Sequence, residues 1–89
     1  MNTNARIMLD ALQHSANEGT RESATALVTG TKLPWAPEGR NAEEMATTGI
    51  LGDFIKTVMT GDYLAAYGAA DVHNQRILRG ILGPDNDRW

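Results

Sequence analysis

The chain has 89 residues, 42% of them hydrophobic, and a formal net charge of −3 from 11 acidic and 8 basic side chains. This length corresponds to one domain, residues 1–89, with enough apolar residues for a core, so wholesale disorder is not expected. The absence of cysteine excludes disulfides and thiolate chemistry, and the mild acidic excess argues against broad binding to nucleic acid.

The sequence also carries no signal for export or membrane insertion. The first six residues lack the basic region and long apolar run of a secretory signal. No window contains the roughly 20 apolar residues that are needed to span a bilayer. We therefore expect a cytoplasmic protein without a membrane partner, located in the host cytoplasm or in a virion if a phage encodes it.

Residues 1–30 are expected to form two short helices. Polar residues at positions 2–4 are candidate caps for a first helix that ends near residues 15–18. Its apolar side chains recur at spacings of three and four, which places them on one face.

Residues 20–33 have two interpretations. Thr20 and Gly30 can begin and end a short helix. The alternative is a β-hairpin that turns at residues 29–31, where β-branched residues flank a glycine. We favour the helix because Pro34 would truncate the second strand.

Residues 31–40 form the one clear loop, because Pro34 and Pro37 disfavour helical backbone in the residues before them. Trp35 lies between these prolines and could belong to a proline-rich recognition segment. A small core needs aromatic area, however, and the chain has only five aromatic residues. We therefore expect Trp35 to be buried and to anchor the loop over the core.

Residues 41–83 show the strongest periodicity, and we expect them to form a long antiparallel helical hairpin around which the rest of the chain packs. Asn41 is a suitable cap for the first half. Gly49 and Gly52 each weaken that half by about 1 kcal/mol relative to alanine, so we expect a close backbone approach or a kink there. Gly61 is expected to end it.

The second half of the hairpin, residues 63–82, has two faces that could pack against a neighbour. One is a stripe of large apolar residues, and the other is a row of small residues on the opposite side. That row consists of Ala65, Ala69 and Val72. A helix with two packing faces can contact more than its own core, so we expect self-association through the small-residue row.

Two polar residues, Asp71 and Asn74, fall inside the large apolar stripe. A buried carboxylate costs several kcal/mol unless it is paired, so one interpretation is a site or a polar registration point at a helix interface. The other interpretation is that both residues lie at the edge of the stripe, where they face water or cap a loop. We favour the second.

The sequence predicts no catalytic residue, no metal ligand and no cofactor. Ser and Thr residues are common, but none has the local frame that would join it to Asp71 and His73 as a nucleophile. His14 and His73 lack the paired spacing of a metal site. We expect both histidines to lie at the surface.

Arg76 and Arg79 share one surface of the last helix, beside Val72. They are too few for a nucleic-acid contact, which makes nucleic acid an improbable partner. As solvated arginines they would complement the helix dipole. In a homo-oligomer they could meet Glu43 and Glu44 of a neighbouring copy.

These observations favour a non-enzymatic protein-interaction module that self-associates, as an accessory or structural subunit of a larger assembly. A phage or mobile-element origin would suit such a chain.

One alternative is a small inhibitor that binds a heterologous protein, such as a host defence or regulatory enzyme, through a patch that includes Trp35 or Trp89. Residues 84–89 form the polar tail that ends in Trp89. A second alternative is an oligomeric sponge for an anionic small molecule, lined by Tyr67, Arg76 and Arg79.

Overall fold

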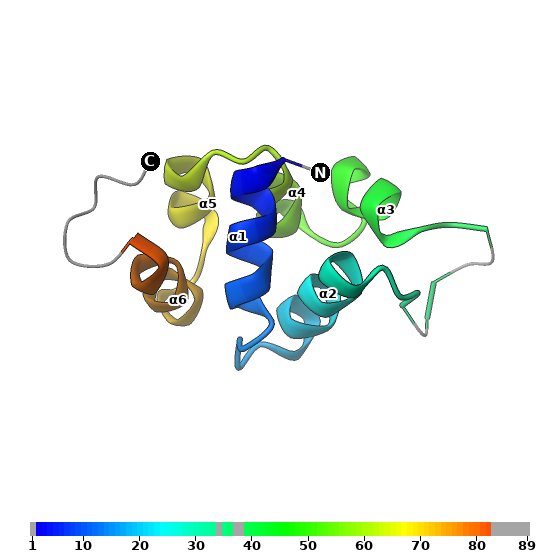
Figure 1. Ribbon diagram of the computed structural model, residues 1–89, viewed down its shortest axis with the longest axis horizontal. Coiled ribbons are helices and arrows are strands. Elements are labelled where there is room, and N and C mark those ends of the chain that lie inside the picture. Colours follow the sequence, from blue (N-terminus) through cyan, green and yellow to red (C-terminus); the bar gives the residue numbers. More distant parts are fainter. Residues whose placement is uncertain (1, 34, 37–38, 83–89) are drawn as a thin grey trace.

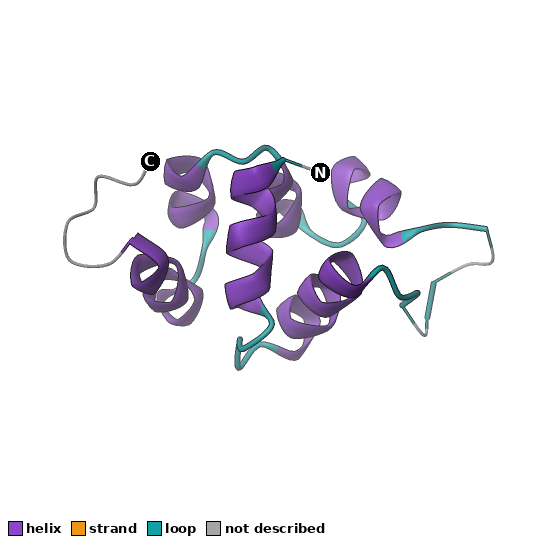
Figure 2. Ribbon diagram, viewed as in Figure 1, coloured by secondary structure: helices purple, strands orange, loops and turns teal. Residues whose placement is uncertain are grey.

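The computed structural model describes residues 2–33, 35–36 and 39–82, and within these ranges the chain forms six helices and no strand (Figure 1, Figure 2). The all-α prediction is therefore confirmed for the described part of the chain. In chain order the helices are α1 (Thr3–Leu12), α2 (Glu18–Thr29), α3 (Ala42–Thr48), α4 (Asp53–Met59), α5 (Tyr63–Ala69) and α6 (Val72–Leu82).

Helix α1 stands at the centre of the molecule (Figure 1). Its N-terminus is capped by Asn2, whose side-chain oxygen accepts a hydrogen bond from the backbone N–H of Asn4 at 2.8 Å. The side chains of Met8, Leu9 and Leu12 are completely buried, and α1 packs against α2, α4 and α6. The core is thus organised around the first helix. The sequence had predicted residues 41–83 as its centre, and that prediction is wrong.

Residues 20–33 contain the C-terminal part of helix α2, so the helical interpretation is confirmed and the hairpin interpretation is wrong. Helix α2 begins two residues before Thr20 because Asn17 provides the N-cap and accepts a hydrogen bond from the Thr20 N–H at 3.1 Å. It ends at Gly30, as the sequence predicts.

The expected long hairpin is divided, and its first half consists of the two short helices α3 and α4. Gly49 has a φ of +88° and closes α3, while the N–H of Ile50 donates to the carbonyl of Met45 at 3.0 Å. This 6→1 hydrogen bond is characteristic of the Schellman motif, which ends a helix. Gly52 has a φ of +102°. The two glycines therefore separate two helices, where the periodicity alone predicted one.

The second half of the expected hairpin is divided at residues 70–71 into α5 and α6. Ala70 is extended, with a ψ of 149°, and the carboxylate of Asp71 accepts a hydrogen bond from the Asn74 N–H at 2.8 Å. Asp71 therefore acts as the N-cap of a new helix. The side-chain amide of Gln75 donates to the carbonyl of Tyr67 at 3.0 Å, which satisfies an acceptor at the end of α5.

The loop between α2 and α3 is anchored by Leu33 and not by Trp35. Leu33 is buried, whereas 54% of the surface of Trp35 is exposed. The expectation of a buried tryptophan is therefore wrong. Buried aliphatic residues from all six helices, together with Tyr63, form the core of the described residues, and Trp35 is not among them.

Candidate functional site

The candidate interaction residues lie on the outer surfaces of α5 and α6. Ala65 and Ala69 belong to α5 and Val72 to α6, and all three are exposed. Because the chain changes direction at residues 70–71, they do not form the single-helix row that the sequence predicted. Leu64 of α5 is also exposed, with 77% of its surface accessible, and Val72 follows at 68%.

A surface hollow of about 200 Å³ lies where α5 meets α6. Arg79 forms part of its wall, and the guanidinium carbon of Arg79 lies 5.9 Å from the centre of the Tyr67 ring. This geometry is that of a cation–π contact. The hollow brings together residues that the sequence analysis had grouped as a candidate anion-binding set. The lining residues are Tyr67, Val72, Gln75, Arg76 and Arg79.

Tyr67 connects the wall of the hollow to the core, because its ring lies beside that of the buried Tyr63. The rings of Tyr63 and Tyr67 are 6.0 Å apart between centroids and tilted by 31°. Burial raises the pKa of the Tyr63 phenol above its ordinary value of 10.0, and the neighbouring Tyr67 acts in the same direction. Arg79 partly opposes this increase because its positive charge favours the phenolate.

Asp71 and Asn74, which we had treated as a pair, have different environments. Asp71 is exposed and caps α6. Asn74 is buried, with 3% of its surface accessible, and its side-chain oxygen accepts a hydrogen bond from the Ser15 hydroxyl at 2.6 Å. The expectation that Asn74 faces water is therefore wrong. The sequence could not indicate this burial, because the partner of Asn74 lies 59 residues away.

Ser15 and His73 belong to a polar cluster that joins the α1–α2 turn to the start of α6. The backbone N–H of Ala16 donates to His73 Nε2 at 3.0 Å, and the Ser15 hydroxyl both donates to Asn74 and accepts from the Asn17 N–H at 3.1 Å. His73 Nε2 therefore accepts from Ala16, and the Ser15 hydroxyl donates to Asn74, so these two side chains are not paired with each other. The cluster fixes the turn against α6 and does not form a nucleophile–base pair.

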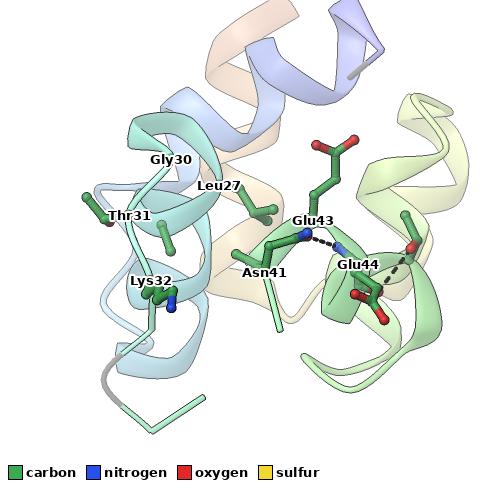
Figure 3. Close-up of a pocket in the computed structure, with 10 residues that line it drawn as sticks. Leu27, Gly30, Thr31, Lys32, Asn41, Glu43 and Glu44 are labelled. Carbon is green, nitrogen blue, oxygen red and sulfur yellow. Dashed lines mark hydrogen bonds between the residues drawn. The ribbon is translucent and has the colours of Figure 1, made fainter. Parts of the chain in front are cut away.

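A second hollow, of about 450 Å³, lies between the end of α2 and the start of α3 (Figure 3). Leu27 contributes apolar surface to it, while Lys32 and Glu43 bring opposite charges. Asn41 accepts a hydrogen bond from the Glu44 N–H at 2.7 Å and so caps α3 beside the hollow (Figure 3). Glu44 also lies 3.4 Å from the Arg40 guanidinium. The sequence analysis missed this hollow, because residues 27 and 43 are joined only by the tertiary fold.

Trp89 and the rest of the predicted tail at 84–89 lie outside the described residues. Within the described ranges, no three histidine or acidic side chains are grouped as a metal site would require. No helix in the same ranges combines the length and apolar character needed to cross a bilayer. The chain matches no protein-family model, no curated protein and no solved structure.

Proposed function

We propose that this protein is a non-enzymatic interaction module that self-associates through the outer surfaces of α5 and α6, as a subunit of a larger assembly. The supporting observation is the position of its two most exposed large apolar side chains in the described part of the chain. Leu64 and Val72 have 77% and 68% of their surfaces accessible, and they belong to these two helices.

The neighbouring residues suit a close contact between two copies. Ala65 and Ala69 are also exposed on α5, and small side chains let a neighbouring backbone approach closely. Burying Leu64 and Val72 in such a contact would contribute roughly 1.5–3 kcal/mol for each fully buried side chain. Arg76 and Arg79 line a hollow together with Val72, and charged residues commonly border an apolar interface.

The test compares Leu64→Asp and Val72→Asp with the native chain by light scattering and native mass spectrometry over a wide range of protein concentration. Both positions are in the first turn of their helices, where a carboxylate is favourable, so the monomer should remain folded. Each substitution should weaken association at least about tenfold.

The matched control is Ile50→Asp. Ile50 is a large apolar residue with half of its surface exposed, but it lies between α3 and α4. This variant should associate like the native chain. A native chain that stays monomeric at all concentrations, or an equal loss of association in Ile50→Asp, would contradict the proposal.

A second candidate function is binding to a heterologous protein, and the exposure of Trp35 favours it. Tryptophan is enriched among the residues that dominate binding energy at interfaces, and Trp35 has 54% of its surface accessible. A genuine partner should be retained by the native chain and by Ile50→Ala in co-purification, and lost with Trp35→Ala. Retention by Trp35→Ala would reject this candidate.

A further inference from the structure

The hollow between α5 and α6 has two arginines on its wall that are available to a ligand. Arg76 and Arg79 are both exposed. Neither forms an ion pair with a carboxylate of the described residues, where the one such pair joins Arg40 to Glu44. Asp71, the nearest acidic residue to Arg76 in the sequence, uses one of its oxygens to cap α6.

Several side chains of this hollow are held in place before any ligand arrives. The Arg79 guanidinium lies over the Tyr67 ring, with 5.9 Å between the guanidinium carbon and the ring centre. The Gln75 amide is fixed by its 3.0 Å hydrogen bond to the Tyr67 carbonyl. Tyr67 in turn packs beside Tyr63, which is buried. Because these groups lose little freedom on binding, the entropic penalty for a ligand is reduced.

The chemistry of the wall selects an anion with several oxygen atoms. Each guanidinium presents a planar set of N–H donors that matches phosphate or carboxylate in a two-point contact. The volume of about 200 Å³ is below the range of roughly 300–1,000 Å³ that is usual for larger ligands. A whole nucleotide would therefore extend beyond the hollow, whereas a single phosphate group would not.

We propose that the hollow lined by Tyr67, Val72, Gln75, Arg76 and Arg79 is a binding site for a phosphate group, free or as a small phosphomonoester. The dianion would be bound by the two guanidinium groups, and the Tyr67 ring would hold Arg79 in position. All of its lining residues come from one copy, so the site does not require self-association. Because Val72 lines the hollow and also belongs to the proposed contact surface, the two proposals are tested with separate readouts.

The test is a titration of the native chain with inorganic phosphate, followed by amide and arginine side-chain NMR shifts at constant ionic strength and low protein concentration. The shifts should be localised at Gln75, Arg76 and Arg79. Arg76→Gln and Arg79→Gln should each raise the dissociation constant about tenfold. Arg6→Gln, which removes an exposed arginine beside a hollow on α1, should leave the constant unchanged.

Parallel titrations with succinate and with chloride distinguish a phosphate site from general attraction of anions. Weaker binding of succinate and no localised response to chloride support the proposal. It is overturned if phosphate produces shifts scattered over the surface, if Arg6→Gln weakens binding as much as the α6 variants, or if succinate binds as tightly as phosphate. Light scattering on the same samples reports self-association separately, so either proposal can fail while the other holds.

Discussion

Asn74 illustrates how one buried amide can join distant parts of a small helical protein. Its side-chain oxygen accepts the Ser15 hydroxyl proton at 2.6 Å, and both residues are almost completely buried. An unsatisfied buried polar group costs about 1–3 kcal/mol, whereas a satisfied pair contributes a smaller net amount. The free energy of unfolding therefore falls most when only one member of the pair is removed.

We predict that Asn74→Ala lowers the free energy of unfolding by about 1–3 kcal/mol, because the Ser15 hydroxyl loses its acceptor. The double variant with Ser15→Ala should cost less than the sum of the two single changes, with a coupling of about 1 kcal/mol. Urea unfolding at low protein concentration measures these values. His14→Ala, at an exposed position, is the control and should change stability by less than about 0.5 kcal/mol. Additive effects would show that the pair is not coupled.

Leu33 and Trp35 offer a direct comparison within one loop. Leu33→Ala should lower the free energy of unfolding by about 2–5 kcal/mol, because Leu33 is 96% buried and its removal leaves a cavity. Trp35→Ala should change it by less than about 0.5 kcal/mol, because the larger part of that side chain already faces solvent. Thermal unfolding of the two variants checks this order. A larger effect at Trp35 would restore the original expectation of a buried anchor.

For single residues, the sequence predicts which side chains cap helices better than it predicts which side chains are buried. The side chains of Asn41 and Asp62 cap helices, as their positions before apolar runs indicate. The burial of Asn74 could not be predicted, because it depends on a serine 59 residues away. The exposure of Trp35 depends on whether other side chains fill the core, which composition does not reveal.

At the scale of the elements, two pairs of helices replace the two long helices that the periodicity predicts. Periodicity reports which side of a segment is apolar, but it does not detect a break that keeps the apolar side in phase. Residues 55 and 58 of α4 are buried as the spacing predicts, although the helix begins only at Asp53. Asp71 is a suitable N-cap by residue type, yet its place within an apolar stripe concealed that role.

Gly49 and Gly52 provide the test of this division. Gly49 is in the left-handed region, with φ +88° and ψ 3°, where alanine costs about 1–2 kcal/mol. Gly52, with φ +102° and ψ 159°, is in a region that is essentially restricted to glycine, where the cost is about 1–3 kcal/mol. Gly49→Ala and Gly52→Ala should therefore lower the free energy of unfolding by about these amounts. An uninterrupted helix through residues 41–60 would give the opposite sign, since alanine is the better helix former.

The control for these variants is Gly19→Ala. Gly19 lies in the first turn of α2, and an added Cβ would make only an ordinary contact of 3.5 Å with the Asn17 side chain. We expect this change to raise the free energy of unfolding by up to about 1 kcal/mol. Urea unfolding of all three variants gives the comparison. Stabilisation by all three would contradict the observed break between α3 and α4.

At the scale of the whole molecule, α1 holds the other helices together. It packs against α2 on one side and α6 on the other, with α4 also in contact (Figure 1). The sequence predicts the helical class and the first two helices, because their caps and apolar spacings are local. It does not predict which helix is central, because that depends on how short helices pack after the chain bends at residues 49–52 and 70–71.

Burial of Tyr63 makes the free energy of unfolding depend on pH. Burial raises the pKa of its phenol above 10.0 in the folded protein, whereas the unfolded chain releases the same proton near that value. The resulting stabilisation is complete below pH 10 and is lost as the pH rises through the raised pKa of the folded state. We therefore predict that the free energy of unfolding falls with increasing pH above about 10.

The measurement is urea unfolding at a series of alkaline pH values for the native chain and for Tyr63→Phe. Because phenylalanine has no proton to lose, the variant should show a shallower decline above pH 10, whatever its stability at neutral pH. Tyr67→Phe is the matched control: Tyr67 is only half-buried, so its removal should change the slope less. Phenolate absorbance should show Tyr63 ionising above its ordinary pKa. Equal slopes in the native chain and Tyr63→Phe would mean that burial of Tyr63 does not link ionisation to folding.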